Sequence, residues 1–405
     1  MEGDEYEDNA SNSPLSVDSA IQQDIPIPNV AYIHSSEFEM HLNKHPRLYG
    51  AVTVTHNLIR AYDLLKNVTV IPPTVATKEE LKSFHSEEYI EFLCKINDMT
   101  EEEVLDEEEE ELEKYGIGYD CPFIPNIFDA ASMIGGATVT AAKALLGRNY
   151  QIAVNWGGGW HHAKKDQADG FCYVNDIVLG ILQLLQKYKR VLYIDLDLHH
   201  GDGVEEAFAH TSRVLCFSIH KNEIGFYPGT GLLNDIGYGK GKYYTINVPL
   251  YDGIQDAQYI ELIIPLLMKT YRKFQPDVIV CQCGADTLAG DPFAAFNLTL
   301  KAPSECIRLF KSWNLPLLIL GGGGYNAVNT ARCWTYLLSI LVDKTIESDI
   351  PDHKYLMKYG PDYEIHICPR TMPNRNSTEH LKLITDTVLR NIDYIQSSAL
   401  ESFGL

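Results

Sequence analysis

The second half of the chain alternates short apolar runs with segments whose apolar residues recur at helical spacing. The runs that predict strands lie at 152–155, 191–198, 214–219, 244–248, 277–281 and 317–320, and an earlier one lies at 30–33. Helical spacing marks 177–188, 204–209 and 257–274. Strands that are apolar along their whole length and separated by helices are typical of a parallel sheet buried on both faces. The pattern predicts an α/β fold with an open parallel β-sheet covered by helices on both faces.

Length and composition favour a single large domain. The chain has 405 residues, 45% of them hydrophobic, so one large core is feasible. No low-complexity linker interrupts its middle. We expect the domain to span residues 29–390. Residues 1–28 are polar and acidic, which predicts a disordered N-terminal segment, and residues 391–405 are expected to form a short C-terminal tail.

The charge balance restricts the partners. The formal net charge is -22, which argues against binding to a nucleic-acid backbone because that requires clustered Lys and Arg. It suits a basic partner or substrate, and solubility alone explains it equally well. A dense acidic block from Glu101 to Glu113 predicts either a charged helix or a flexible surface loop.

Cysteine usage and hydropathy indicate the compartment. The nine cysteines are scattered without a CxxC pair, and no signal peptide is present, which predicts a reducing intracellular environment. No run of about 18 apolar residues occurs, so no membrane span is expected.

Polar clusters follow the predicted strands. They are Trp160-His161-His162, Asp195 to Asp202, Ser218-Ile219-His220, Gly284-Ala285-Asp286 and Gly321 to Tyr325. Ligands of open α/β sheets bind at the carboxyl ends of the strands, so we expect all of these clusters to meet at one edge.

One of these clusters predicts a metal site. Alternate residues of a strand point to one face, so Asp195, Asp197 and His199 should share a side. Asp286, after another strand, is the natural third ligand beside Asp197 and His199. Two carboxylates and an imidazole leave a position open for water, as catalytic zinc sites require. A two-metal site is the rival interpretation, because Asp195 and Asp202 are also near.

Adjacent histidines at a glycine-rich strand end predict acid–base chemistry. His161 and His162 follow Gly157-Gly158-Gly159-Trp160, and Asp195 and Asp202 are available to orient them. A carboxylate fixes the imidazole tautomer and raises its basicity, so one histidine would take a proton from water and give it to a leaving group.

Three aromatic residues complete the candidate site. Tyr325 follows four glycines, which allow close approach of the backbone to a ligand, so its phenol is a candidate donor to a developing oxyanion, although this signal alone is weak. The glycine run lacks the Lys-Ser/Thr ending of a phosphate-binding P-loop. Phe171 and Tyr227 lie on loops after strands and are candidates for lining a narrow apolar tunnel, although each alone is compatible with ordinary packing.

In this order and spacing, seven motifs resemble those of zinc-dependent histone deacetylases, over about residues 30 to 385. They are Asn155 to Lys164, Gly170 to Asp176, Tyr193 to Gly203, Ser218 to Lys221, Tyr227 to Gly231, Gly284 to Asp286 and Gly321 to Tyr325. The class I branch fits best, and Asp291-Pro292 resembles its isoform-eight-like members.

The resemblance implies an arginase/deacetylase-like fold and a hydrolase. Its reaction would be hydrolysis of N6-acetyl-lysine in histones and other proteins, with longer acyl chains as further candidates. It also implies a role in chromatin and transcription, and residence in nucleus and cytoplasm. It names no corepressor partner.

The resemblance further implies catalytic roles residue by residue. The zinc ligands would be Asp197, His199 and Asp286. His162, paired with Asp202, would act as general base and then as general acid. His161, paired with Asp195, would supply positive charge near the leaving amine. Tyr325 would polarise the acetyl carbonyl.

Substrate and structural-ion sites are also implied. The substrate-binding residues would be Asp120, Gly170, Phe171, Tyr227, Phe293 and Tyr325, with Asp120 gripping the substrate backbone. One structural K⁺ would use Asp195, Asp197, His199, Ser218 and backbone carbonyls. A second would use the carbonyls of Phe208, Thr211, Val214 and Tyr244.

The sequence departs from the family pattern at two rim positions. The family usually has Phe where Tyr227 stands, and Met or Leu where Phe293 stands, so we expect altered inhibitor and acyl-chain preference. The acidic block is expected to attract Lys/Arg-rich substrates.

Three alternatives stay open on the residues alone. An arginase-like ureohydrolase with two Mn²⁺ shares the Asp-x-His chemistry, but the paired histidines and the glycine run before Tyr325 favour the deacetylase. A deacetylase of polyamines or other small amines would share the catalytic residues. An inactive acyl-lysine-binding scaffold would have no need of the intact ligand set or of Tyr325.

Overall fold

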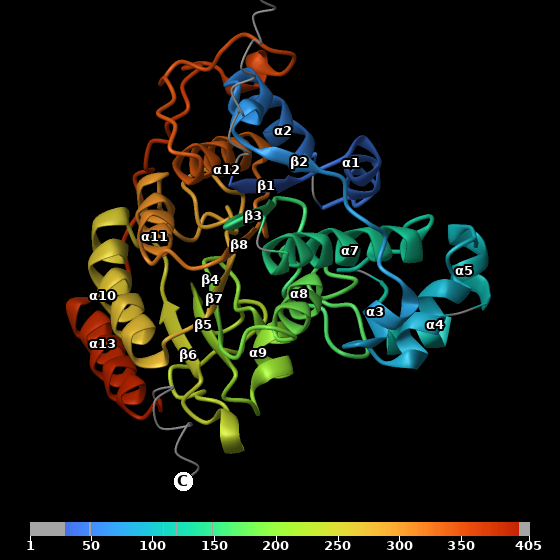
Figure 1. The fold of residues 1–405 in the computed structure, drawn as a ribbon, viewed down its shortest axis with the longest axis horizontal. Coiled ribbons are helices and arrows are strands. Elements are labelled where there is room, and N and C mark those ends of the chain that lie inside the picture. The colour runs from blue at the N-terminus through green and yellow to red at the C-terminus, as the bar shows by residue number, and fades with distance from the viewer. Residues whose placement is uncertain (1–28, 48–49, 108, 119, 148, 397–405) are drawn as a thin grey trace, which may run out of the picture.

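An eight-stranded, wholly parallel sheet forms the centre of the protein (Figure 1). The computed structural model describes residues 29–47, 50–107, 109–118, 120–147 and 149–396. The strands are β1 (Val30–Ile33), β2 (Thr69–Ile71), β3 (Ile152–Asn155), β4 (Val191–Asp195), β5 (Val214–Lys221), β6 (Thr245–Leu250), β7 (Val278–Gln282) and β8 (Leu317–Leu320). Their order across the sheet is β2-β1-β3-β8-β7-β4-β5-β6.

Helices cover both faces of this sheet, as the alternation predicts. One face carries α7 (Ile127–Leu146), α8 (Asp176–Leu184) and α9 (Asp202–Phe208). The other carries α2 (Ala51–Ala61), α10 (Asp256–Phe274), α11 (Lys301–Ser312), α12 (Ala327–Leu341) and α13 (Thr378–Asp393) (Figure 1). The remaining helices are α1 (Ser36–Asn43), α3 (Lys78–Lys82), α4 (Glu87–Lys95), α5 (Glu101–Glu107) and α6 (Glu109–Lys114). Every residue of β1, β3, β4, β7 and β8 is buried between the two layers.

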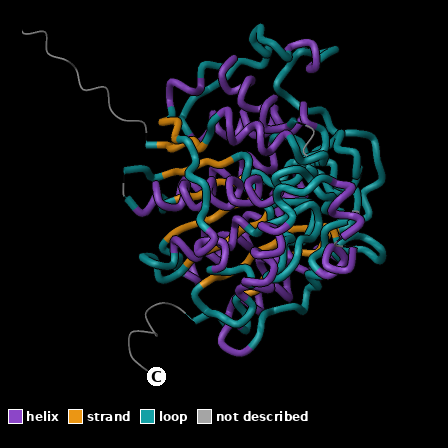
Figure 2. Tube along the Cα trace, turned by 90° about the vertical axis from the view of Figure 1, so that its right-hand side faces the viewer, coloured by secondary structure: helices purple, strands orange, loops and turns teal. Residues whose placement is uncertain are grey.

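The strand order brings the polar clusters together. The chain passes from β3 to β4 across the sheet, and β8 and β7 later fill the gap between them. The carboxyl ends of β3, β8, β7 and β4 are therefore neighbours. The turned view in Figure 2 shows loops gathered along one side of the strands. This is the edge where ligands of open α/β sheets bind.

Several predicted element boundaries were wrong. The strand predicted at 191–198 ends at Asp195, and the helix predicted at 177–188 is α8, which ends at Leu184. Ser218 and His220 lie within β5 rather than after it, because the strand continues to Lys221. The acidic block forms two short helices, α5 and α6, rather than a loop.

The described residues can be compared with the predicted domain boundaries at the two ends of the chain. The segment 1–28, predicted to be disordered, lies outside the described residues, as does most of the predicted tail. Helix α13 continues to Asp393, three residues beyond the predicted boundary at 390. None of the helices in the described ranges combines the length and the apolar character needed to cross a membrane.

Candidate active site

The loop after β4 carries the first two candidate metal ligands, but not by strand alternation. Because β4 ends at Asp195, Asp197 and His199 lie beyond the strand. The Asp197 N–H donates to Asp195 Oδ1 at 3.1 Å, and the His199 N–H donates to Asp197 Oδ1 at 3.0 Å. Each aspartate thus closes a local turn on its own backbone two residues ahead. These turns, rather than a pleated strand, direct Asp197 and His199 to a common space.

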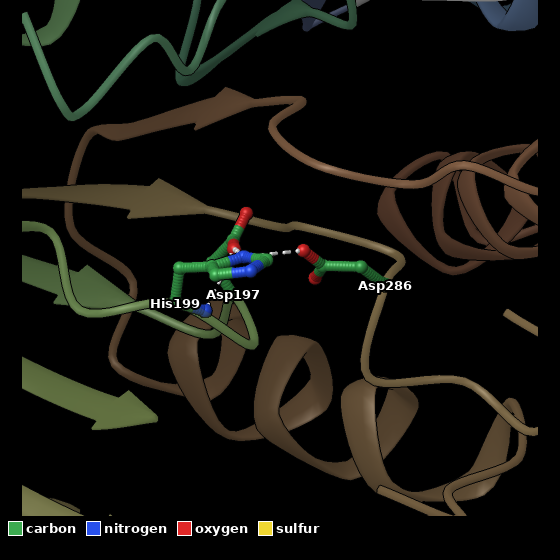
Figure 3. A group of neighbouring side chains, drawn as sticks. All are labelled: Asp197, His199 and Asp286. Atoms are coloured by element: carbon green, nitrogen blue, oxygen red, sulfur yellow. Dashed lines mark hydrogen bonds and ion pairs between the residues drawn. The ribbon is translucent and has the colours of Figure 1, made fainter. Parts of the chain in front are cut away.

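Asp197, His199 and Asp286 form a buried cluster with metal-ligand geometry. Their donor atoms lie within 4.8 Å of one another, and their polar ends face each other in Figure 3. His199 Nδ1 lies 3.0 Å from Asp286 Oδ2 and 3.3 Å from Asp197 Oδ1. The prediction that Asp286, from the loop after β7, joins the other two is confirmed.

The electrostatics of this cluster favour a cation. Burial alone would lower the pKa of His199, but the two carboxylates raise it to about 10. Burial and the charge of Asp197 raise the pKa of Asp286. Two desolvated carboxylates facing one imidazole are stabilised by positive charge between them. Two oxygens and one nitrogen form the donor set of a three-ligand zinc site.

Gln282 supports the metal cluster, and sequence reasoning missed it. Its Nε2 donates to Asp197 Oδ2 at 2.7 Å, and its Oε1 accepts the Gly284 N–H at 2.7 Å. A Cβ on Gly284 would lie 2.1 Å from Asp197 Oδ2, so only glycine fits there. An amide inside an otherwise apolar strand was the signal that could have revealed Gln282.

The two histidines each have their own carboxylate, as predicted. His161 Nδ1 donates to Asp195 Oδ2 at 2.8 Å, and His162 Nδ1 donates to Asp202 Oδ1 at 2.7 Å. Their rings lie 4.0 Å apart between centroids, and both are buried. His161 Nε2 lies 3.9 Å from Asp197 Oδ1, beside the metal cluster, and both histidines line a pocket.

The two histidines differ in charge. Burial disfavours the cation of His161, but Asp195 and Asp197 raise its pKa to about 9. Burial, followed by the neighbouring His161, lowers the pKa of His162 to about 3. His161 is therefore the cation of the pair, and His162 is neutral and available as a base.

Lys164 is a second missed participant. Its Nζ lies 2.5 Å from Asp202 Oδ2, on the side away from His162. Burial would raise the pKa of Asp202, but His162 and Lys164 hold it well below its usual value. Lys164 belongs to the same short motif as the histidines, which was the available signal.

Asp176 holds the backbone that presents these histidines. Its carboxylate accepts the Gly159 N–H at 3.0 Å and the Trp160 N–H at 2.8 Å. It also accepts the hydroxyl of Thr138 from α7. Nothing local in the sequence indicates this role, because Asp176 is the first residue of α8, where acidic residues are common anyway.

Asp291 positions Tyr325. One of its carboxylate oxygens accepts the Tyr325 N–H at 2.9 Å, and the other accepts the Phe293 N–H at 3.0 Å. Burial, together with the nearby Asp286 and Asp197, raises the pKa of the Tyr325 phenol well above its ordinary value. The phenol therefore stays protonated and can donate a hydrogen bond.

The predicted substrate residues converge on one cavity. It is lined by Asp120, His162, Gly170, Phe171, His199, Tyr227, Phe293 and Tyr325. Asp120 is exposed at its edge, and the rings of Phe171 and Phe293 contact Tyr325 edge-on at 5.8 and 5.0 Å. An adjoining inner pocket, lined in part by Arg47, Trp156 and Trp334, was not predicted, because Arg47 is far from the other residues in sequence.

The structure gives the surroundings of several residues that are expected to hold potassium, but it does not test either potassium site. Ser218 stands opposite Asp195 in the sheet, and its Oγ lies 2.9 Å from His220 Nδ1. The Phe208 carbonyl accepts the Thr211 N–H at 3.1 Å, and the Tyr244 carbonyl accepts the Cys216 N–H at 2.9 Å. Both potassium sites stay predictions.

A parallel α/β sheet that brings an Asp-His-Asp cluster beside two histidine–aspartate pairs is the architecture of a metal-dependent hydrolase. Residues 43–341 match the family model described as "Histone deacetylase domain". The chain therefore belongs to the histone deacetylase family.

Comparison with individual relatives identifies the branch of the family. The chain is 49% identical to histone deacetylase 8 of Xenopus tropicalis, over 88% of this chain and 96% of that protein. It is 51% identical to histone deacetylase 8 of Xenopus laevis, over 80% of this chain and 98% of that protein. Identity to human histone deacetylase 1 is 45%, over 86% of this chain and 71% of that protein. The chain is an isoform-eight-like member of class I.

Proposed function

We propose that this enzyme hydrolyses the acetamide of N6-acetyl-lysine in histones and other proteins, releasing acetate and free lysine. The observation that carries the proposal is the meeting of two histidine–aspartate pairs with the Asp197, His199 and Asp286 cluster, beside a cavity that His162 and His199 line. Longer acyl chains are additional substrates under this proposal.

The proposal includes a catalytic Zn²⁺ held by Asp197, His199 and Asp286. When bound, Zn²⁺ supplies Lewis-acid polarisation of the amide carbonyl and makes water easier to deprotonate. The donor set and the burial of all three residues support this assignment.

His162 and His161 divide the proton chemistry. His162 Nε2 takes the proton from the attacking water as the new C–O bond forms at the acyl carbon. It then delivers that proton to the lysine nitrogen as the C–N bond breaks. A low pKa supports the neutral state that His162 needs to begin as a base. His161 stays cationic and stabilises negative charge near the leaving amine.

Tyr325 and the cavity walls complete the proposed mechanism. The protonated phenol donates a hydrogen bond to the carbonyl oxygen as that oxygen becomes anionic. Gly170, Phe171, Tyr227 and Phe293 surround the lysine methylenes, and the exposed Asp120 accepts backbone N–H groups of the substrate.

The remaining assignments follow the family resemblance. Residues 29–390 form the catalytic domain. Two structural K⁺ ions bind, one at Asp195, Asp197, His199 and Ser218 with backbone carbonyls, the other at the carbonyls of Phe208, Thr211, Val214 and Tyr244. The enzyme works in nucleus and cytoplasm on chromatin and other proteins, without direct contact to nucleic acid.

An acetate-release assay on zinc-reconstituted enzyme tests the proposal. We expect turnover of acetyl-lysine peptides with about one zinc per chain. Two manganese ions per chain with urea release would point to a ureohydrolase. Preference for acetylated polyamines would point to a small-amine deacetylase, and peptide binding without acetate release would point to a scaffold.

A further inference from the structure

One hydrogen bond joins the two walls of the substrate cavity. The Tyr227 hydroxyl donates to Asp169 Oδ1 at 2.7 Å. Tyr227 belongs to the segment between β5 and β6, whereas Asp169 immediately precedes Gly170 and Phe171. Gly170, Phe171 and Tyr227 all line the cavity. The bond therefore runs from one lining segment to the other.

The hydroxyl reaches Asp169 only because residue 170 is glycine. A Cβ at Gly170 would lie 2.6 Å from the Tyr227 hydroxyl and 2.5 Å from His162 Cδ2. The Tyr227 ring stands edge-on to His162, with centroids 5.0 Å apart and planes at 77°. The phenol thus passes over Gly170, next to the proposed general base.

The wall that carries Phe171 is a tight turn. The Asp169 N–H donates to the Cys172 carbonyl at 3.0 Å, and the Cys172 N–H donates to the Asp169 carbonyl at 2.7 Å. Gly170 and Phe171 between them have φ of 49° and 71°, a left-handed pair that two-residue hairpin turns use. A phenylalanine at positive φ is unusual and is retained only where its surroundings hold it.

The opposite wall is anchored independently. Phe226, beside Tyr227, stacks on the His199 ring with centroids 5.2 Å apart and planes at 8°. Lys221 at the end of β5 pairs with Asp252 at 2.6 Å. Each wall therefore has its own support, and the Tyr227–Asp169 bond directly couples them.

We propose that the Tyr227–Asp169 hydrogen bond is a brace that holds the two walls of the substrate cavity at a fixed separation, so that the enzyme selects acyl groups by their cross-section. This inference rests on the proposed deacetylase function. A flat acetyl group passes with the bond intact, whereas a branched acyl group must part the walls and break it. Because this bond is only partly buried, water compensates in part for its loss, so breaking it corresponds to the discrimination of an ordinary net hydrogen bond, roughly threefold to tenfold.

The test compares acyl groups on one peptide. The zinc-loaded full chain is assayed with acetyl-lysine and isobutyryl-lysine, and the readout is the ratio of kcat/KM for isobutyryl to acetyl. Tyr227→Phe removes the donor and keeps the ring, and Asp169→Ala removes the acceptor. We expect each to raise the ratio roughly threefold to tenfold. The double variant should raise it no further, because both changes break the same bond.

Two controls separate the brace from a general loosening of the fold. Asp169→Asn keeps an acceptor oxygen and should leave the ratio near that of the wild type. Tyr238→Phe removes the hydroxyl of an exposed tyrosine outside the cavity and should leave it unchanged. Melting temperatures of all variants are compared with the ratios.

The outcomes that overturn the inference are distinct. An unchanged ratio in Tyr227→Phe, or single effects that multiply in the double variant, overturns the brace while the deacetylase function stands. A wild-type enzyme that releases no acetate overturns the proposed function, and with it the inference that rests on it.

Discussion

At the scale of single residues, environment rather than identity assigns the chemistry of the site. His161 and His162 are adjacent, buried and each bonded to an aspartate, yet their pKa values move in opposite directions. His161 also faces Asp197, whereas His162 faces the cationic His161. The second carboxylate near His161 accounts for the difference, because an extra negative charge stabilises an imidazolium.

Tyr325→Phe tests the oxyanion role at this scale. Losing one preorganised donor to a developing oxyanion typically costs about 10² to 10³ in rate. We expect zinc content and melting temperature close to those of the wild type, with kcat reduced by about that factor. Metal analysis together with acetate release measures both. Full activity in the variant would reject the role.

At the residue scale, most residues of the candidate site could be predicted from the sequence. The residues that hold them in position could not. The grouping of Asp197, His199 and Asp286 was predicted because metal-ligating residue types follow strands, and the structure brings the three together. Gln282, Lys164, Asp176 and Asp291 were missed, because each acts through another residue that is distant in sequence or through a backbone group. Such supporting roles depend on which segments of the chain lie side by side in the folded protein.

At the scale of elements, the positions of the site residues are set by short polar turns more than by the strands that these turns follow. The segment after β4 is shaped by the Asp195 and Asp197 carboxylates accepting amides two residues ahead. The loop after β3 is held by Asp176, the first residue of a helix on one face of the sheet. The site is therefore built from loops that buried carboxylates fix to the sheet and to its helices.

Asp176→Ala should destabilise the fold through this mechanism. It leaves the buried N–H groups of Gly159 and Trp160 without their acceptor, and each unsatisfied group costs about 1–3 kcal/mol. We expect the free energy of unfolding to fall by roughly 3 kcal/mol. Urea denaturation of this variant is compared with that of Asp362→Ala, an exposed aspartate. Equal midpoints for the two variants would contradict the assignment.

Elements were predictable where their apolar pattern was strong. Strands β3, β4, β5, β6, β7 and β8 were located from continuous apolar runs, with errors of a few residues at their ends. Helix α7 was not, because it is rich in Ala, Gly and Thr and buried on nearly every face, which removes the amphipathic period. Strand β2 is only three residues long and partly exposed, so it carries no such run.

At the scale of the whole molecule, the candidate metal cluster links two loops that are distant in sequence but follow neighbouring strands of the sheet. The proposed ligands come from the loops after β4 and β7, so a bound ion would tie the two loops together. An ion that binds only the folded state stabilises it by about 2.7 kcal/mol at a hundred times its dissociation constant. We expect chelation to lower the melting temperature by several degrees and added zinc to restore it. His199→Ala should show no such dependence on zinc, and equal melting of the wild type with and without metal would refute the site.

The two acidic helices are connected to one wall of the cavity through the segment that follows them. Helices α5 and α6 precede Tyr115, whose carbonyl accepts the Ala168 N–H at 2.9 Å, next to the turn that carries Phe171. The acidic helices are thereby anchored near the cavity edge. We infer that their carboxylates draw Lys/Arg-rich substrates toward it.

Neutralising this charge tests the inference. Changing Glu109, Glu110 and Glu113 to Gln should raise KM for basic peptides several-fold at low salt. The difference should disappear at high salt, because the screening length falls to about 3 Å at 1 M. Neutralising Glu379, Asp386 and Asp393 on α13 removes the same charge elsewhere and serves as the control. An unchanged KM and salt dependence would sink the idea.

The sequence by itself determined the α/β class, the residue types of the candidate site and the edge of the sheet at which they meet. These follow from local properties, namely continuous apolar runs and the polar residues that end them. The tertiary structure alone decided which amide holds Asp197, which carboxylate holds the Gly159 and Trp160 backbone, and that Tyr227 reaches across to Asp169. Those pairings join residues many positions apart, and packing of the sheet and its loops, rather than any local pattern, brings them within hydrogen-bond distance.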